Sequence, residues 1–337
     1  MKTPDAEVDK MSLMDRLAGR KTSINRELEK SLAVGDNETL REAMKHYPLA
    51  GGKRLRPLLA YLVAESISGD GEATIPFGVG LELIHNFTLV HDDIMDRSDM
   101  RRGIASVHKK FDVSTAIVAG DALFALAFEQ ICSLQIEDAL LRIIVGDTAL
   151  AVREVAEGQQ MDMEFEKRSD ITVKDYLSMI DKKTARLYFT AARTGAIISK
   201  APLEQIRSMG DMGYLMGIGF QIWDDVLDLE GEEGKTGKPF GGDIREGKRT
   251  LMVVYAFSHL KGEDKKTFLS VLGNQKASRK SIEEAVGLLH KCGAVSYAKN
   301  FALEYVREAK ERASSLKSSE AKDLLLDLID YSVRRDN

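Results

Sequence analysis

Two copies of one acidic motif set the strongest constraint on how this chain can fold. Each copy reads D-D-x-x-D and ends a long apolar stretch with helical periodicity, at Asp92 to Asp96 and at Asp224 to Asp228. Carboxylates three and four residues apart lie on one helix face, about one turn apart. Ionised carboxylates on one face repel each other unless cations lie between them, and hard oxygen ligands favour Mg²⁺ over softer metals. We therefore expect two helices whose acidic ends meet around a metal-bound polyanion, with diphosphate as the foremost candidate.

Helical periodicity extends over almost the whole chain and predicts an all-α fold. Apolar residues recur at three- and four-residue spacing, strand-like alternation is scarce, and only six prolines interrupt the chain. No stretch has the composition of an interdomain linker, so we expect residues 1–337 to form a single helical domain. The expected helices are 8–34, 54–68, 76–97, 113–135, 138–166, 172–199, 202–229, 248–261, 264–273, 278–291, 294–316 and 319–334.

Composition narrows the class of protein. Hydrophobic residues make up 44% of the chain and charged residues 30%, with a formal net charge of −5. These values are typical of a globular protein with a large core, and they give no reason to expect nucleic-acid binding. The N-terminus lacks a signal-peptide core, no apolar run approaches a membrane span, and Cys132 and Cys292 have no metal-binding spacing. We expect a cytoplasmic protein with reduced thiols and no stable membrane insertion.

A narrow polar seam leads to each acidic motif. At about 100° per residue, His85 projects in nearly the same direction as Asp92 and Asp96. Gln221 takes a similar place before Asp224 in the second helix. Each of these residues alone could be a satisfied polar side chain of the core, because buried polar groups are usually hydrogen-bonded. Their alignment with the carboxylates favours a role in the site.

Basic residues lie in turns and at helix starts near the acidic motifs. They occur in Gly51-Gly52-Lys53-Arg54-Leu55-Arg56-Pro57 and in Arg101-Arg102-Gly103. A basic pair is usually a solvated face, but here helix starts also offer backbone N–H groups to anions. Arginine binds phosphate through two hydrogen bonds and lysine acts as a point charge. The chain thus holds two ways to bind diphosphate, through Mg²⁺ on aspartates and directly on Lys and Arg, which implies two diphosphate substrates.

Together these motifs closely resemble those of the isoprenyl (polyprenyl) diphosphate synthases, most like short-chain geranylgeranyl diphosphate synthases. The resemblance runs from about Gly51 to Thr250. It includes Gly-Gly-Lys-Arg-Leu-Arg-Pro, His-Asp-Asp-Ile-Met-Asp, Arg-Arg-Gly and Gln-Ile-Trp-Asp-Asp-Val-Leu-Asp, in the order and approximate spacing of the family. It implies the isoprenoid synthase fold, a helical bundle around a deep central cavity, and typically a homodimer. It also implies Mg²⁺ as cofactor, with isopentenyl diphosphate and an allylic diphosphate as substrates.

The resemblance assigns a role to each matching residue. Asp92 and Asp96 would bind Mg²⁺ on one side of the allylic diphosphate, and Asp224, helped by Asp228, on the other. The diphosphate of isopentenyl diphosphate would be held without metal by Lys53, Arg56, His85 and Arg102. The allylic diphosphate would also contact Arg101, Lys183, Thr184, Gln221, Lys238 and Lys248, and the catalytic set would be Asp92, Asp96, Asp224, Lys183 and Lys238. Supporting roles would fall to Gln159, Asp162, Arg54, Asp93 and Asp225.

The implied reaction is a condensation that begins with ionisation of the allylic C–O bond. Mg²⁺ neutralises the departing diphosphate, and the isopentenyl double bond attacks the resulting allylic cation. In the family, the last step is loss of a proton from the condensed product, and the departed diphosphate accepts this proton. An apolar cavity that excludes water would protect the cation, which explains polar seams on otherwise apolar helices.

Product length in the family depends on the residues four and five positions before the first motif, here Thr88 and Phe87. One large aromatic residue beside a smaller one resembles enzymes that stop at geranylgeranyl diphosphate. Phe87 could also be an ordinary core residue. The alternative function is that of a farnesyl or a bifunctional farnesyl/geranylgeranyl diphosphate synthase.

Two further hypotheses assign the chain a function other than chain elongation. A class I terpene cyclase also ionises an allylic diphosphate on Mg²⁺, but it usually has one D-D-x-x-D motif and needs no basic site for a second diphosphate. A non-catalytic partner subunit would be expected to have lost one acidic motif, whereas both are intact here.

Overall fold

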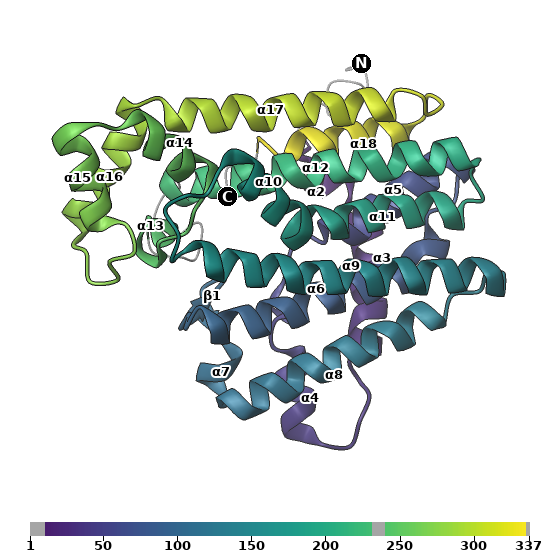
Figure 1. The fold of residues 1–337 in the computed structure, drawn as a ribbon. Helices are drawn as coiled ribbons and strands as arrows, with labels where there is room; N and C mark the ends of the chain where they lie inside the picture. Colours follow the sequence, from purple (N-terminus) through teal and green to yellow (C-terminus); the bar gives the residue numbers. More distant parts are fainter. Residues whose placement is uncertain (1–10, 231–239, 335–337) are drawn as a thin grey trace, which may run out of the picture.

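The computed structural model of the protein describes residues 11–230 and 240–334. These residues form a helical bundle with one short β-hairpin, whose strands have two residues each (Figure 1). The all-α prediction is confirmed. The elements are α2 (Leu13–Arg16), α3 (Ala18–Ser31), α4 (Glu38–Lys45), the 3₁₀ helix η1 (Pro48–Ala50), α5 (Leu55–Ser68), the 3₁₀ helix η2 (Glu72–Thr74), α6 (Ile75–Met95), β1 (Met100–Arg101), β2 (Ile104–Ala105), α7 (Val107–Lys110), α8 (Val113–Cys132), α9 (Asp138–Phe165), α10 (Val173–Ile180), the π-helix η3 (Asp181–Ala185), α11 (Arg186–Ile198), α12 (Leu203–Glu230), α13 (Gly242–Glu246), α14 (Leu251–His259), α15 (Gly262–Val271), α16 (Arg279–Lys291), α17 (Ala294–Ala313) and α18 (Glu320–Tyr331).

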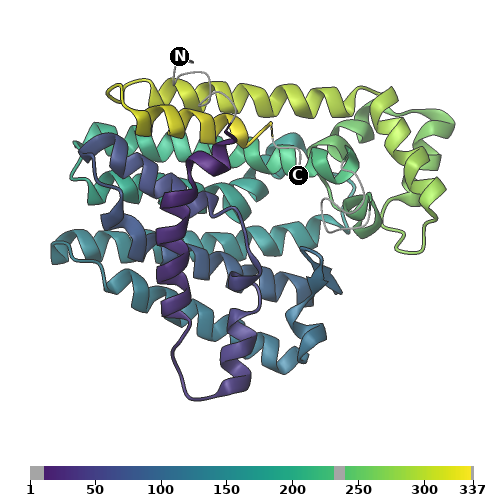
Figure 2. The same cartoon turned by 180° about the vertical axis from the view of Figure 1, so that it is seen from behind.

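The long helices lie side by side, with the two motif-bearing helices inside the bundle. α12 packs between α11 and α17, and α6 packs against α5 and α8. α5 and α11 also contact each other, so they join the part of the bundle around α6 to the part around α12. Seen from behind, α3 crosses the outside of the bundle at a steep angle to the long helices (Figure 2). This packing buries the apolar faces and brings the ends of α6 and α12 toward each other.

Several short elements depart from the expected helices. The expected helix 8–34 is divided into α2 and α3, and the expected helix 172–199 is interrupted by the π-helix η3. α4 was not predicted, because its eight residues span only about two turns. The hairpin of β1 and β2 was also missed, since its strands have two residues each. Its two-residue turn, Arg102-Gly103, has positive φ at both positions (52° and 77°), the geometry that matches strand twist in tight hairpins.

Two helical segments, Glu72–Met95 and Val113–Cys132, are long and apolar enough to cross a membrane by length and composition alone. Burial separates them: 61% of the apolar window in the first is buried in the bundle, against 39% in the second. Core helices of globular proteins meet the same criterion, and packing within the bundle accounts for the apolar character of α6. The less buried α8 keeps an exposed apolar face.

Candidate active site

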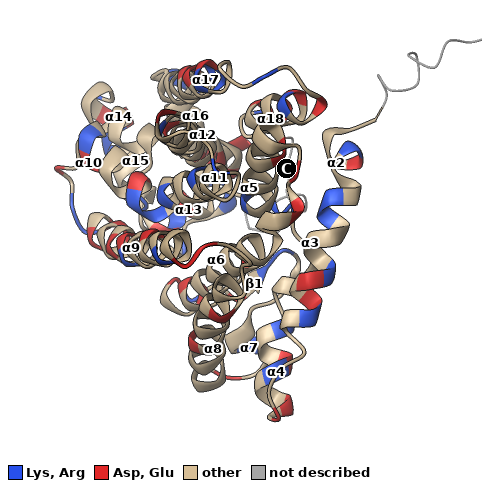
Figure 3. Cartoon of the chain, turned by 90° about the vertical axis from the view of Figure 1, so that its right-hand side faces the viewer, with Lys and Arg blue, Asp and Glu red and all other residues tan. Residues whose placement is uncertain are grey.

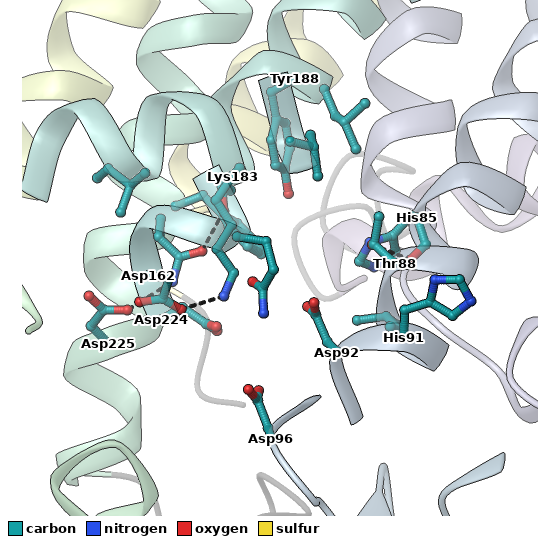
Figure 4. A pocket seen from close by; sticks show the side chains of 18 of the residues that line it. His85, Thr88, His91, Asp92, Asp96, Asp162, Lys183, Tyr188, Asp224 and Asp225 are labelled. Atoms are coloured by element: carbon teal, nitrogen blue, oxygen red, sulfur yellow. Dashed lines mark hydrogen bonds and ion pairs between the residues drawn. The ribbon is translucent and has the colours of Figure 1, made fainter. Parts of the chain in front are cut away.

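The two acidic motifs face one cavity of about 980 Å³. Figure 4 shows Asp92 and Asp96 on one side of a gap, with Asp224 and Lys183 on the other. Lys238 lies outside the described residues. The other residues predicted to bind substrate or metal, or to limit chain length, all line this cavity: Lys53, Arg56, His85, Phe87, Thr88, Asp92, Asp96, Arg101, Arg102, Lys183, Thr184, Gln221, Asp224, Asp228 and Lys248.

In the first motif the middle carboxylate is tied into the protein. Asp93 is only 1% exposed. It accepts hydrogen bonds from Nε and Nη2 of Arg101 at 2.9 and 2.7 Å, and from the hydroxyl of Tyr47 at 2.5 Å. Because the two neighbours in this motif point about 100° apart, this anchor turns Asp92 toward the cavity. Arg101, predicted to contact the allylic diphosphate, lines the cavity while its guanidinium group is engaged by Asp93.

The second motif repeats this arrangement with different partners. Asp225 accepts a hydrogen bond from the hydroxyl of Tyr176 at 2.7 Å and one from Nε2 of Gln221 at 2.8 Å. Gln221 in turn accepts from the hydroxyl of Thr184 at 2.7 Å. Asp225 also lines the cavity, and its two hydrogen bonds hold its carboxylate in place beside Asp224. Gln221 and Thr184 therefore support the motif from within the protein, beside the cavity they line.

Asp228 connects the second motif to the next short helix. Its Oδ2 accepts a hydrogen bond from the backbone nitrogen of Asp243 at 3.0 Å, and its backbone oxygen accepts from Gly241. This places the carboxylate of Asp243 in the same cavity lining. Asp243 was missed in the sequence because it stands alone after a Gly-rich stretch, 15 residues beyond Asp228.

Two lysines lie among these carboxylates. Nζ of Lys183 is 2.6 Å from Oδ2 of Asp162. Nζ of Lys248 is 2.8 Å from Glu246, 3.8 Å from Asp243 and 3.9 Å from Asp96. Both motifs stand near the C-terminal ends of their helices, where the helix dipole adds negative charge. The ends of α6 and α12 therefore concentrate a negative field that these cations partly neutralise.

The pKa directions follow from this crowding. Burial raises the pKa of Asp92 above its ordinary value, although Lys183 opposes the shift. Burial and the nearby Asp243 raise the pKa of Asp225 well above the usual range. Burial acts to lower the pKa of Lys183, but Asp162 and Asp92 outweigh it, so that its pKa is raised. The site thus holds more carboxylate charge than its lysines balance, and added cations would relieve the excess.

A basic region lies beside the acidic one and is organised by Arg54. This residue immediately precedes α5, has a φ of 55° and is 4% exposed. Its guanidinium group donates to Glu82 at 2.7 Å, to Asn25 at 2.8 Å, and to the backbone oxygens of Gly51 and Pro48. Arg54 is therefore used inside the protein, where it fixes the loop that precedes α5.

The other basic side chains of this region remain at the cavity. Arg56 lies over the ring of Tyr188, 4.6 Å from Cζ to the centroid, and Lys53 lies 5.2 Å from the ring of Tyr331 in α18. Arg102 donates to the backbone oxygen of Gly51 at 3.1 Å. Burial and the positive charge of Arg56 lower the pKa of His85 well below its ordinary value. His85 is thus a neutral hydrogen-bonding group among cations, a combination suited to an anion.

Aromatic residues border another part of the cavity. The ring of Phe87 stands edge-on to the rings of His91 and Phe124, with centroids 5.6 and 5.3 Å away. Phe124 makes a further edge contact with Phe128 on α8. Phe87 lines the cavity and is supported from behind by α8, whereas the Thr88 hydroxyl donates to the backbone oxygen of His85 at 2.8 Å.

The donor set fits a hard divalent cation that shares its coordination with a ligand. Asp92, Asp96 and Asp224 offer only carboxylate oxygens to the gap. Among residues 11–230 and 240–334, no three His, Cys, Asp or Glu side chains converge as a ready-made metal site. Mg²⁺ is usually held by one or two carboxylates together with substrate phosphates and water, so facing carboxylates without a complete cage suit it.

Comparison with known proteins agrees with this geometry. A family model described as polyprenyl synthetase matches residues 37–289. The geranylgeranyl diphosphate synthase of Methanosarcina mazei is 39% identical over 97% of this chain and 99% of its own length. The geranylfarnesyl diphosphate synthase of Natronomonas pharaonis is 36% identical over 95% of this chain and 96% of its own length.

Solved structures resemble the fold equally well. Geranylgeranyl pyrophosphate synthetase from Pyrococcus horikoshii superposes with a TM-score of 0.90, at 40% identity over 96% of this chain and 98% of that one. A polyprenyl synthase from Caulobacter crescentus, complexed with calcium and isoprenyl diphosphate, gives a TM-score of 0.89 at 28% identity, with the same coverage of each chain.

Proposed function

We propose, because this chain belongs to the polyprenyl synthetase family, that it is a prenyltransferase that condenses isopentenyl diphosphate with dimethylallyl, geranyl and farnesyl diphosphates to give geranylgeranyl diphosphate. One observation carries the proposal: both acidic motifs and a separate basic region line a single cavity. An enzyme that joins two diphosphates needs one site that activates a leaving group and another that only holds its ligand.

The two parts of the cavity divide this work. Asp92, Asp96 and Asp224 would hold Mg²⁺ against the allylic diphosphate, where the metal would stabilise the negative charge of the leaving group. Asp228 would support the second motif. Lys183 and Lys248 would exchange part of their contacts with carboxylates for contacts with diphosphate oxygens, because a new anion competes for their positive charge.

The basic region would hold the second substrate without metal. Lys53, Arg56 and Arg102 would bind the diphosphate of isopentenyl diphosphate, and the neutral His85 would donate a hydrogen bond rather than a charge. The apolar wall of the cavity would exclude water while the allylic cation exists. The isopentenyl double bond would then attack the cation, and the departed diphosphate would accept the proton that is lost.

Product length would depend on Phe87, which borders the cavity with Phe124 behind it. The similarity to geranylgeranyl diphosphate synthases favours a C20 product. A relative with comparable identity is named geranylfarnesyl diphosphate synthase, for a C25 product. The product length of this protein therefore depends on individual side chains around the cavity, and it must be measured.

The test is incubation of the purified protein with isopentenyl diphosphate and, separately, dimethylallyl, geranyl or farnesyl diphosphate, with products sized by chromatography. We expect a C20 diphosphate from all three starters, and no product when Mg²⁺ is chelated. A protein that leaves farnesyl diphosphate unextended would be a farnesyl diphosphate synthase. Release of a hydrocarbon without isopentenyl diphosphate would indicate a terpene cyclase, and complete inactivity would favour a non-catalytic partner subunit.

We also propose that the protein is a homodimer formed through α8 and α9. α8 is almost uncharged (Figure 3), yet its apolar residues Ile117, Val118 and Phe124 are 43%, 51% and 37% exposed. Ile143 and Leu150 on α9 are similarly exposed. Exposed apolar faces of this kind are typical of subunit interfaces. Light scattering on the purified protein should give the mass of two chains, and a monomer at micromolar concentration would contradict this assignment.

Two further assignments complete the proposal. One hydrophobic core extends from Leu17 to Val333 and supports a single domain. The free thiols of Cys132 and Cys292 support residence in the reducing cytoplasm. Acidic and basic residues alternate along the helices in Figure 3, which favours small-molecule substrates over nucleic acid.

A further inference from the structure

A buried tyrosine contacts the middle carboxylate of each acidic motif. Tyr47 donates to Oδ2 of Asp93 at 2.5 Å, and Tyr176 donates to Oδ2 of Asp225 at 2.7 Å. Both tyrosines are nearly inaccessible, at 1% and 0% exposure. They stand at similar distances before their partners in the chain, 46 and 49 positions. Each motif therefore has one hydrogen bond from a buried tyrosine to its middle carboxylate, and each tyrosine comes from outside the motif helices.

The position of these contacts determines where the other carboxylates point. In a helix, the second residue of D-D-x-x-D is rotated by about 100° from the first, whereas the first and fifth lie close to one direction. A hydrogen bond that holds the second carboxylate in its own direction therefore lets the first and fifth face the cavity together. Asp92 and Asp96 do so in the first motif, and Asp224 and Asp228 line the cavity in the second.

We propose that Tyr47 and Tyr176 are positioning residues, whose hydroxyl groups hold Asp93 and Asp225 so that the outer carboxylates of both motifs are oriented for metal-bound diphosphate. This inference rests on the proposed function. In this proposal the tyrosines act through the middle carboxylates and not as metal ligands, although Tyr176 also lines the cavity. Neither residue could be singled out from the sequence, because each lies far along the chain from its partner.

The two contacts differ in what remains when the hydroxyl is removed. Asp93 keeps the guanidinium group of Arg101, a cation with three contacts of 2.7 to 2.9 Å. Asp225 keeps only the amide of Gln221 at 2.8 Å among its side-chain hydrogen bonds in the described residues. A buried carboxylate that loses one partner suffers most when no cation remains beside it. Tyr176→Phe should therefore disturb its motif more than Tyr47→Phe.

The experiment compares Tyr47→Phe and Tyr176→Phe with Tyr61→Phe, a matched control. Tyr61 is also buried, but its hydroxyl faces Glu72, away from both motifs. The first readout needs no turnover: it is the rise in melting temperature that Mg²⁺ and inorganic diphosphate together produce. The second is the concentration of Mg²⁺ for half-maximal activity, measured beside the KM for isopentenyl diphosphate, whose site needs no metal.

We expect Tyr176→Phe to reduce the ligand-induced rise in melting temperature and to raise the half-saturating Mg²⁺ concentration about tenfold, the lower end of what the loss of an outer hydrogen bond at a metal site causes. Tyr47→Phe should show a smaller change in the same direction. The KM for isopentenyl diphosphate should stay within about twofold of wild type in both variants. Tyr61→Phe should match wild type in its response to Mg²⁺.

A double-mutant cycle with Asp225→Asn shows whether Tyr176 acts through this carboxylate. If it does, Tyr176→Phe should add little to the effect of Asp225→Asn, because the shared contact is already altered. Additive effects, or an unchanged response to Mg²⁺ and diphosphate in Tyr176→Phe, would overturn the inference while the proposed function stands. If wild type itself shows no response to Mg²⁺ and diphosphate, the proposed function fails and this inference fails with it.

Discussion

A Cβ atom placed on Gly158 would lie only 2.3 Å from the backbone nitrogen of Lys183. The backbone of α9 therefore touches the π-helix η3, an approach that only glycine allows. Short π-helical turns occur often at functional sites. Here the wider turn places Lys183 beside Asp162, at 2.6 Å, and facing the gap between the acidic motifs.

This contact predicts that Gly158→Ala lowers both stability and activity. The added methyl group would force α9 and η3 apart, at a cost of about 1–3 kcal/mol in the free energy of unfolding. It would also move Lys183 away from the cavity. Gly287→Ala is the matched control, since that helical glycine has open space around it and alanine favours helix. Thermal melts and steady-state kinetics of the two variants should diverge, and equal behaviour would show that the contact is unimportant.

Asp224 should be indispensable for turnover. Asp224→Asn removes a charged ligand opposite the first motif, and we expect kcat to fall by about a hundredfold or more, as when other groups that stabilise transition-state charge are lost. Asp211→Asn on the same helix changes an exposed aspartate and serves as control. A loss of less than about fivefold in Asp224→Asn would argue against a metal-binding role.

Phe87→Ala should lengthen the product. Removing the ring opens the space between the cavity and Phe124, so that the growing chain can pass a point where it now stops. The measurement is the chain length of the product made from farnesyl diphosphate, with Phe301→Ala on α17 as the control for loss of an aromatic ring. An unchanged product in Phe87→Ala would remove Phe87 as the residue that limits chain length.

The lowered pKa of His85 predicts a specific dependence of stability on pH. The folded protein keeps His85 neutral, while the unfolded chain binds a proton below about pH 6.5. Stability must therefore fall as the pH drops through this range, by about 1 kcal/mol between pH 7.5 and 5.5 from this residue alone. His85→Gln should lose less stability than wild type over the same interval. The exposed His290→Gln should follow wild type, and a parallel loss in wild type and His85→Gln would contradict the assignment.

The long helices could be predicted from sequence because their apolar period repeats over many turns. α6 and α12 were placed within a few residues of their observed ends, and so were the motifs that close them. The π-helix could not be predicted, because it depends on contact with Gly158 in another helix. The tyrosine partners of Asp93 and Asp225, and the approach of Asp243 to Asp228, likewise arise from tertiary packing, which leaves no local pattern.

The central claim is that both acidic motifs bind the same diphosphate through metal ions. The most direct measurement is anomalous diffraction from crystals grown with Mn²⁺, as a visible substitute for Mg²⁺, and a non-reactive allylic diphosphate analogue. We predict Mn²⁺ peaks beside Asp92 and Asp96 and beside Asp224, all in contact with the same diphosphate. Metal at only one motif, or a diphosphate bound solely by the basic region, would contradict the account.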